Sequence, residues 1–432
     1  MLFRSQWDLQ SFSLISVTSY SHIDQQIFSS LCYDDPNDPV LPAPGGGAQC
    51  VYGTAYGNAA TPGEAIDDYF NSLDNLRTFT QDVRLESHTK GPLEWVIGSA
   101  YLWRDYLSGF DSGAILAPDR TLDDVYAPWN DKKDDWWSVY GQLIWRVTQR
   151  LELSAAARYD DERYNNTTYT DRTESVVVPV RSGTGDYIDT QRESADAFQP
   201  KGQVSYHVTD DVMGYVTVSR GFRAGYYDTG TYTLPEHTTN YELGLKTSFW
   251  DHRITANTAV FHIDYSDQQF SSVINEYPYR TSISIPKTKI NGAEFESTLV
   301  ASRFASFSVG FGYLNAQVGD GTTSPAAPRV NASVAMDLSY PAFLDWKARL
   351  HVDDRFNSSQ YMSTGDDQLV PSKDYVNLRA GFQNERYDIA AFVKNATNER
   401  QITYAGAENF AGGFIRYINE PRSYGVEARM SF

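Results

Sequence analysis

The residues best suited to chemistry in this 432-residue chain are histidines that stand close to carboxylates. His351 and Asp353 are two positions apart, so an extended strand would place both side chains on the same face. Such a pair can act as an oriented general base when a nucleophilic serine lies beside it. The surrounding pattern places no serine there, and the neighbouring positions of that face are charged. We therefore expect no catalytic site and no enzyme.

Metal and phosphate sites are not predicted either. His262 shares a strand face with Asp264, and Glu242 is expected on the neighbouring strand, but such residues on a wet face are most simply solvated. Residues 45–47 are glycines without the strand, turn and helix that surround a phosphate-binding loop. No cofactor is expected. The histidines lack the spacing of metal ligands; they are His22, His88, His207, His237, His252, His262 and His351.

The two cysteines, Cys32 and Cys50, lie in a stretch rich in proline and glycine, LCYDDPNDPVLPAPGGGAQC (residues 31–50). Two interpretations remain open: a disulfide that ties this loop in an oxidising compartment, or two free thiols. The disulfide is the preferred interpretation.

The elements that would position the polar residues are β-strands. The chain ends in RSYGVEARMSF (residues 422–432), where apolar and polar residues alternate without a slip. This alternation predicts a strand with one apolar and one polar face. The apolar row consists of Tyr424, Val426, Ala428, Met430 and Phe432, and the polar row of Gly425, Glu427, Arg429 and Ser431.

The same alternation recurs along the chain, for example in residues 151–160 and 330–340. It predicts about sixteen strands, each close to the roughly ten residues that a tilted strand needs to cross a bilayer. The predicted strands are residues 8–28, 77–88, 94–107, 135–147, 150–163, 195–208, 212–226, 237–249, 252–267, 286–299, 304–317, 327–340, 344–356, 373–383, 387–397 and 417–432.

The predicted connections alternate in length. Short turns, such as residues 90–94 and 250–252, alternate with long polar segments, such as residues 29–76, 108–134 and 164–194. Short turns at one end of the strands and long loops at the other are typical of outer-membrane barrels. We therefore expect an all-β fold, a transmembrane antiparallel β-barrel in the bacterial outer membrane. A soluble β-sandwich is the alternative.

The composition is compatible with this fold. Aromatic residues make up 14% of the chain, with 30 Tyr and 30 Gly, while the mean hydropathy is −0.47. The net charge of −19 argues against a nucleic-acid partner. The sequence contains no run of roughly eighteen apolar residues, so it predicts no transmembrane helix. The opening residues MLFRSQWDLQ lack the pattern of a secretory signal.

In such a barrel the apolar rows would face lipid and the polar rows the lumen. Aromatic residues near strand ends would form interfacial girdles at Tyr101, Trp103 and residues 136–137, 226–227 and 249–250. The last strand would end at the inner interface with its terminal phenylalanine. Its alternation also resembles the segment that outer-membrane barrels present to their assembly machinery.

Five segments resemble those of one family, the TonB-dependent outer-membrane receptors. KINGAEFES (289–297) resembles the family's Asn-Gly pair followed by Glu-Phe-Glu, and VSRGFRAGYY (218–227) its Ser-x-Gly-Phe-Arg-x-Gly segment before an extracellular loop. NYELGLKTSFWDHRITANTAVFHIDYSD (240–267) is similar to the family's Tyr-Glu-Leu-Gly-x-Lys strand with its turn and returning strand. VKNATNERQITY (393–404) resembles the late Val-x-Asn-x-x-Asn segment, and QDVRLES (81–87) an early-barrel strand.

The resemblance implies part of a 22-stranded receptor barrel. Family members carry an N-terminal plug domain and a short box that contacts the TonB energy-transducing complex, and residues 1–432 resemble neither. The whole chain would then be one barrel domain, N-terminally incomplete and without a plug. An autonomous sixteen-stranded pore is the alternative, because an even number of strands permits closure.

The resemblance also implies energised uptake of a scarce, bulky solute, in most members a ferric siderophore. A passive porin-like channel is the alternative function. The implied partners are outer-membrane lipid and lipopolysaccharide, the TonB complex and the barrel-assembly machinery. Arginine suits an anionic chelate and aromatic rings suit stacking, although rings at strand ends also serve as membrane anchors. The candidate ligand residues are Arg223, Tyr226, Tyr227, Tyr232, Tyr404 and Phe410.

Charges of both signs interleave on the predicted lumenal face, and opposite charges on adjacent strands attract. We expect a paired polar lumen. The basic members are Arg84, Arg104, Arg146, Arg158, Lys246, Lys347, Arg349, Arg379 and Arg429, and the acidic ones are Asp82, Glu86, Glu152, Glu242, Glu294, Glu296 and Glu427.

Overall fold

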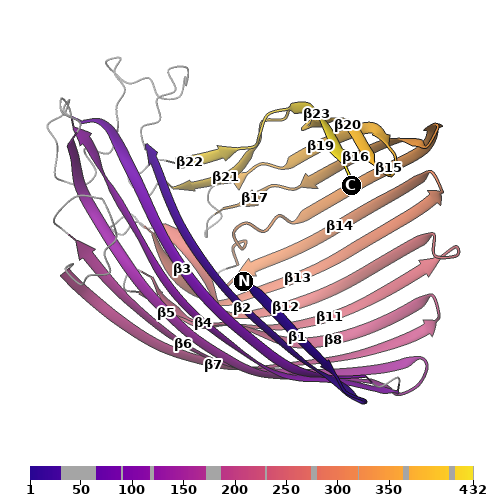
Figure 1. Ribbon diagram of the computed structural model, residues 1–432, viewed down its shortest axis with the longest axis horizontal. Coiled ribbons are helices and arrows are strands. Elements are labelled where there is room, and N and C mark those ends of the chain that lie inside the picture. The colour runs from indigo at the N-terminus through magenta and orange to yellow at the C-terminus, as the bar shows by residue number, and fades with distance from the viewer. Residues whose placement is uncertain are drawn as a thin grey trace.

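The computed structural model describes residues 1–30, 65–88, 91–116, 121–171, 186–228, 231–273, 280–319, 321–362, 369–407 and 414–431 (Figure 1). These residues form one curved antiparallel sheet of 17 strands and three small two-stranded sheets. In these ranges, no helix has the length and apolar character needed to cross a membrane.

The large sheet contains β1 (Leu2–Asp8), β2 (Phe12–Ser30), β3 (Ala65–Ser87), β4 (Leu93–Leu116), β5 (Thr121–Arg146), β6 (Leu151–Asp171), β7 (Asp186–Thr209), β8 (Val212–Arg223), β11 (Glu236–Phe249), β12 (Ile254–Val273), β13 (Arg280–Ser302), β14 (Ala305–Val318), β15 (Val330–Phe343), β16 (Trp346–Asn357), β19 (Lys373–Gln383), β20 (Tyr387–Lys394) and β23 (Ser423–Met430). The small sheets pair β9 (Tyr226–Asp228) with β10 (Thr231–Thr233), β17 (Gln360–Tyr361) with β18 (Leu369–Val370), and β21 (Ile402–Ala407) with β22 (Phe414–Ile418).

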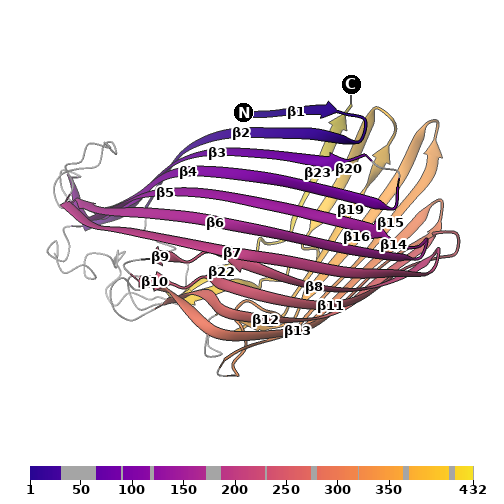
Figure 2. The same cartoon turned by 90° about the horizontal axis from the view of Figure 1, so that it is seen from below.

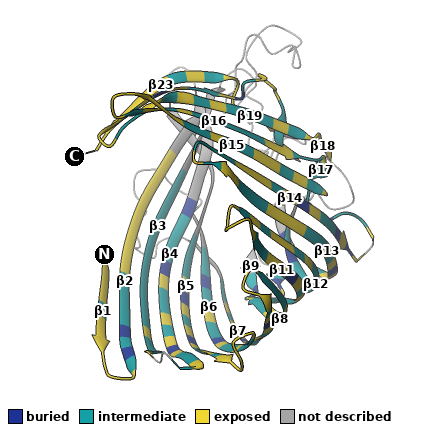
Figure 3. Cartoon of the chain, turned by 90° about the vertical axis from the view of Figure 1, so that its right-hand side faces the viewer, coloured by how far each residue is buried: buried dark blue, intermediate teal, exposed yellow. Residues whose placement is uncertain are grey.

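Each strand of the large sheet pairs antiparallel with the next, past the inserted hairpins. β1 and β23 are the two edges of the sheet, and among the described residues they do not pair with each other (Figure 3). An even number of antiparallel pairings separates them, so both run toward the short-turn end, and direct pairing between them would be parallel. The described strands therefore do not form a self-closed antiparallel pore of sixteen strands.

The two faces of the sheet differ in burial. Buried side chains stand almost entirely on the polar face, as Ser138, Asp160 and Ser205 illustrate. The apolar face remains open: Val426 is 76% exposed and Met430 41%. Side chains crowd together on the inside of a curved sheet and splay apart on the outside. The polar face therefore lies on the inside of the curve and the apolar face on the outside, as predicted for the terminal strand.

Aromatic rings form two bands on the outer face. In the band away from the short turns, the ring centroids of Phe79 and Tyr101 are 6.5 Å apart, and those of Trp137 and Tyr159 are 5.7 Å apart. The band at the short turns includes ring contacts such as Phe304–Tyr340, with centroids 4.8 Å apart, and Phe343–Trp346, with centroids 6.1 Å apart. Two aromatic bands on either side of an apolar zone are typical of transmembrane barrels.

The predicted girdle is wrong at Trp136 and at residues 226–227. Trp136 faces the lumen, where its Nε1–H donates to Asp160 Oδ1 at 2.8 Å. Successive residues of a strand point to opposite faces, so only Trp137 of this adjacent pair can face lipid. Tyr226 belongs to β9, outside the large sheet.

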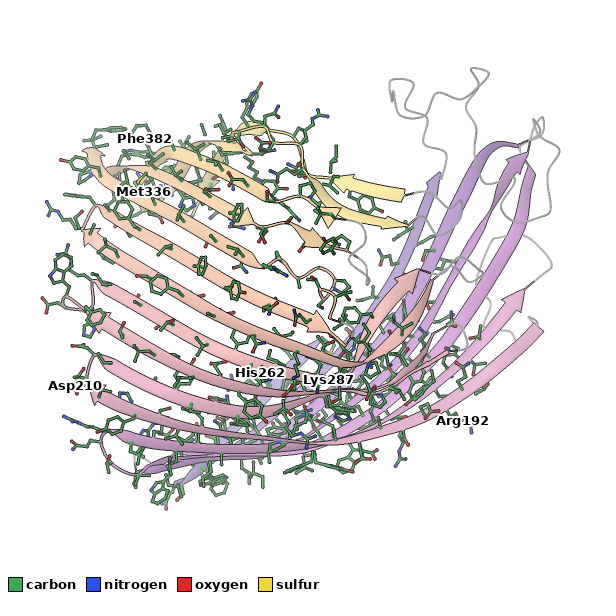
Figure 4. All side chains as sticks on the ribbon, turned by 180° about the vertical axis from the view of Figure 1, so that it is seen from behind. Arg192, Asp210, His262, Lys287, Met336 and Phe382 are labelled. Atoms are coloured by element: carbon green, nitrogen blue, oxygen red, sulfur yellow. The ribbon has the colours of Figure 1, made fainter. Side chains whose placement is uncertain are left out.

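Several predicted strand boundaries are also wrong. Residues 8–28 were predicted as one strand but contain the turn of the β1–β2 hairpin. Segments 108–134 and 164–194, predicted as loops, continue the β4–β5 and β6–β7 pairings in their described parts. Figure 4 shows this length on β7: Asp210 lies at the short-turn end and Arg192 far along the strand toward the other end. In these extensions apolar and polar residues no longer alternate regularly, while the backbone pairing continues with register shifts at Ser112/Gly113 and Thr168/Tyr169.

Glycines on the lumenal face make room for aromatic rings. A Cβ at Gly244 would overlap the ring of Tyr215 directly opposite. The Tyr215 hydroxyl donates to Glu242 Oε1 at 2.6 Å, and Lys246 Nζ is 5.8 Å from the ring centroid. Glu242, Gly244 and Lys246 thus surround one ring, which accounts for the spacing of the Tyr-Glu-Leu-Gly-x-Lys segment. The same glycine-to-ring overlap occurs in the pairs Gly98–Tyr140, Gly292–Phe261 and Gly425–Phe392.

The two asparagines of the VKNATNER segment have structural roles. Asn395 is buried with φ 50°, its Nδ2 donates to the carbonyls of Glu399 (2.9 Å) and Glu420 (3.0 Å), and its Oδ1 accepts from the Glu399 amide (3.0 Å). Asn398 has φ 56°, and its Oδ1 accepts from the Arg422 amide at 3.0 Å. Asparagine tolerates this left-handed conformation better than most residues. The segment therefore ties the end of β20 to the chain that enters β23.

Candidate functional site

The predicted arginine lies at the loop end of β8. Arg223 is the last residue of that strand and has the same lumenal parity as Tyr215 and Thr217. Its guanidinium carbon is 6.0 Å from the ring centroid of Tyr226. Arg223 is exposed, while Tyr226 is half-buried. A cation beside an aromatic ring offers an anionic ligand both charge and a stacking surface.

The β9–β10 hairpin follows Arg223, and its strand β10 contacts β13 (Figure 2). The Tyr226 hydroxyl and Ser282 Oγ are hydrogen-bonded at 2.9 Å, and the Leu234 amide donates to Ser284 Oγ at 2.9 Å. Ser282 and Ser284 have the lumenal parity of β13. The connection between β8 and β11 therefore bends inward, beside the lumen.

The other predicted ligand residues are only partly described. Tyr232 of β10 is half-buried and lies opposite Tyr227 of β9, and Tyr404 of β21 lies opposite Tyr417 of β22. The structure thus brings Tyr226 and Tyr232 to one hairpin, which follows Arg223 at the end of β8, and places Tyr404 in another. The side chains of Tyr227 and Tyr404 fall outside what the structure describes. The residues Phe410, Cys32, Cys50 and Phe432 lie outside the described ranges altogether.

Charge pairs line the lumen across β3 to β6. Arg84 lies between two carboxylates, with Nη1 2.8 Å from Asp82 Oδ1 and Nε 2.6 Å from Glu86 Oε1. Arg158 Nε is 2.9 Å from Asp160 Oδ1, and its guanidinium carbon lies 4.8 Å from the Trp136 ring centroid. The predicted paired lumen is confirmed here. Further pairs are Arg104–Asp134, Arg146–Glu94, Arg146–Glu152, Arg379–Asp388 and Arg379–Glu427.

The histidine and aspartate considered first lie on the lumenal face of β16. His351 Nδ1 is 2.8 Å from Asp337 Oδ1, and His351 Nε2 is 3.6 Å from Asp353 Oδ2. A carboxylate therefore faces each ring nitrogen. A general base that activates a nucleophile needs one nitrogen directed at that nucleophile. This geometry holds a histidine between two acids and does not form a catalytic dyad.

Sequence reasoning missed a serine, histidine and aspartate that meet at the short-turn end. Ser13 Oγ donates to Asp8 Oδ1 at 2.5 Å and also contacts His88 Nε2. His88 Nε2 is itself 3.7 Å from Asp8 Oδ1. In a catalytic triad the serine and the aspartate use opposite ring nitrogens, whereas here both face Nε2, and Ser13 is only 2% exposed. The cluster ties the β1–β2 turn to the end of β3.

Within the described ranges, no three His, Cys, Asp or Glu side chains come together in a way that could hold a metal ion. His262 lies on the outer face, where Nδ1 is 2.8 Å from Asn291 Oδ1 and Nε2 is 3.3 Å from Asp264 Oδ2. The expected lumenal position near Glu242 is wrong, because Glu242 has the opposite parity and bonds to lumenal Tyr215.

Known proteins share this architecture. A family model described as "TonB dependent receptor-like, beta-barrel" matches residues 2–396. The ferric yersiniabactin uptake receptor FyuA from Yersinia pestis has a similar structure, with a TM-score of 0.76 and 14% identity over 100% of this chain and 60% of that one. The ferric-catecholate import receptor Fiu from E. coli K12, in its closed form, has a TM-score of 0.71 and 15% identity, over 100% of this chain and 63% of that one.

The siderophore receptor PiuA from Acinetobacter baumannii is similar as well, with a TM-score of 0.71 and 15% identity over 99% of this chain and 63% of that one. At such identities the likeness shows the fold. The chain spans less than two thirds of the length of these solved structures.

Proposed function

Because this chain belongs to the TonB-dependent receptor family, we propose that it forms the barrel of an outer-membrane importer whose cargo is a ferric siderophore. Proteins of this family sit in the bacterial outer membrane and are transporters rather than enzymes. The outer aromatic bands, the apolar outer face and the polar lumen of this chain fit that location.

The observation that carries the cargo assignment is the pair formed by Arg223 and Tyr226. Their side chains lie together at the loop end of the lumen, 6.0 Å from guanidinium carbon to ring centroid. Ferric siderophores are bulky chelates with anionic oxygen donors, and many carry aromatic rings. A guanidinium supplies charge and hydrogen bonds to such oxygens, while the tyrosine ring offers a stacking face. Tyr232 on the same hairpin, and Tyr404 and Phe410 in the later connection, complete the proposed ligand set.

The proposed partners follow from the same assignment. Outer-membrane lipid and lipopolysaccharide surround the apolar face, and the barrel-assembly machinery reads the terminal strand with its exposed Tyr424, Val426 and Met430. The TonB complex supplies energy to the receptor of which this barrel is a part. In the oxidising periplasm and at the cell surface, Cys32 and Cys50 pair as a loop disulfide.

Uptake of radioactive iron tests the proposal. The gene encoding this chain, in its full reading frame, is expressed in a strain that lacks its own siderophore receptors. We expect uptake of a ferric catecholate, ferric hydroxamate or ferric citrate complex, and loss of that uptake when the TonB complex is deleted. Uptake of none of these complexes, with the protein present in the outer membrane, contradicts the siderophore assignment.

The same experiment separates an importer from a passive porin-like channel. A passive channel admits small solutes regardless of the TonB complex, because diffusion needs no energy input. Uptake that persists after deletion of the complex therefore favours the channel. Uptake that disappears favours the receptor.

A further inference from the structure

We propose that Gln269 is the positioning residue that holds the β9–β10 hairpin beside the lumen, where the hairpin presents Tyr226 next to Arg223 for an anionic ferric chelate. The presentation of a chelate rests on the proposed function. The role of Gln269 in holding the hairpin does not depend on the proposed function, and it can be tested without any ligand.

The Gln269 side chain joins both stems of the hairpin. Its Nε2 donates to the carbonyl oxygen of Ala224, which precedes β9, at 2.8 Å. The same nitrogen donates to the carbonyl oxygen of Leu234, which follows β10, at 2.9 Å. Gln269 is 8% exposed, so these hydrogen bonds are protected from water. One side chain therefore fixes the two points at which the connection bends away from the β8–β11 ladder.

The bend is supported from several directions. The Gln269 backbone N–H donates to the Oε2 atom of Glu236, at the start of β11, at 2.8 Å. Ser282 and Ser284 of β13 bond to Tyr226 and to the Leu234 amide, as described above. Gly225 permits the close approach, because a Cβ there would lie 2.5 Å from the Thr233 carbonyl oxygen. Among these contacts, only the Gln269 carboxamide reaches both stems at once.

The chemistry requires a carboxamide. Two carbonyl oxygens can be satisfied by one neutral nitrogen only if it carries two hydrogens, as the amide of glutamine does. A glutamate at this position would have the same shape but would direct carboxylate oxygens at the two carbonyls. Gln269→Glu therefore removes the donors while keeping the volume, and Gln269→Ala removes both. Gln268 lies next to it on the opposite face, so Gln268→Ala is the matched control.

The first measurement is amide hydrogen exchange on the full chain folded in detergent, without ligand. We expect the backbone amides of residues 226–228 and 231–233 to exchange roughly ten- to a hundredfold faster in Gln269→Glu, because the loss of two hydrogen bonds makes local opening more frequent by about that factor. Gln269→Ala should speed exchange of the hairpin amides to the same degree. Gln268→Ala should leave their exchange at the wild-type rate, and the amides of residues 255–261 should exchange at the wild-type rate in every variant. Wild-type exchange of the hairpin in Gln269→Glu overturns the proposal, and so does equal acceleration in Gln268→Ala.

The second measurement is binding of ferric citrate and of a ferric tris-catecholate, followed by tryptophan fluorescence quenching. We expect Gln269→Glu and Arg223→Ala each to weaken binding about tenfold. The double variant should lose little more, because both changes disrupt one contact surface. Unchanged binding in Gln269→Glu, with the hairpin loosened, overturns the presentation of ligand by the hairpin. Absence of binding to the wild type counts against the proposed function and against that presentation, while the exchange rates still decide the role of Gln269.

Discussion

Replacing Gly244 with alanine should destabilise the folded sheet by about 2.5–4.5 kcal/mol. A Cβ at this position would overlap the ring of Tyr215, and overfilling a packed site costs about 1–3 kcal/mol. The displaced ring also loses its 2.6 Å hydrogen bond to Glu242, which contributes roughly 1 kcal/mol in a partly open lumen. Its contact with Lys246, 5.8 Å from the ring centroid, adds about 0.5 kcal/mol.

The assay is reversible guanidinium unfolding of the chain in lipid or detergent, with the free energy of unfolding as the measured quantity. Gly202→Ala is the matched control, because no heavy atom lies within 4 Å of the added Cβ. Both variants change the entropy of the unfolded chain alike, so the difference between them isolates the overlap. In a Tyr215→Ala background, Gly244→Ala should cost little. Equal stability of Gly244→Ala and Gly202→Ala refutes the reasoning.

Three further predictions concern the outer face, the lumen and the turn after β20. Val216→Arg puts a charge on the outer, apolar face and should lower the free energy of unfolding by about 2–4 kcal/mol. Ser219→Arg on the lumenal face should lower it by less than about 1 kcal/mol. Equal losses in the two variants contradict the assignment of the faces. Arg379→Ala leaves two carboxylates without their shared cation, and we expect a loss of about 1 kcal/mol that shrinks at high salt, so a salt-independent loss argues against pairing. Asn395→Ala should cost about 2–4 kcal/mol in the same assay, because buried hydrogen bonds are lost at φ 50°. Asn398→Ala, which loses one solvent-exposed hydrogen bond at φ 56°, should cost about 1 kcal/mol.

Strands could be predicted from the sequence wherever one face is apolar and the other polar. Residues 327–340 and 344–356 were predicted as strands, and the structure has β15 over Val330–Phe343 and β16 over Trp346–Asn357. Beyond the aromatic band away from the short turns, apolar and polar residues no longer alternate regularly. The long extensions of β4 to β7 therefore gave no signal, although their backbones continue to pair, with register shifts at Ser112/Gly113 and Thr168/Tyr169.

The candidate site was predictable only in part. Arg223 and Tyr226 are three residues apart, so a local motif sufficed to bring them together. The inward bend depends on Gln269, whose hydrogen-bond partners lie 45 and 35 residues away in the sequence. The Ser13–His88 contact spans 75 residues. Contacts at such separations are set by strand register, which a single sequence specifies through packing rather than through spacing.

Strand length is very uneven around the sheet. β5 has 26 residues and β20 has 8, which corresponds to heights of about 65 Å and about 20 Å at the usual rise and a tilt near 40°. Figure 1 shows β3 to β7 as the long strands of the sheet. A hydrocarbon layer of about 25 Å would leave this tall flank projecting roughly 40 Å beyond the bilayer. Antibodies and bacteriophages arriving from outside the cell would meet the crest of that flank before they reach the pore mouth, so surface recognition and solute entry would fall on different parts of the molecule.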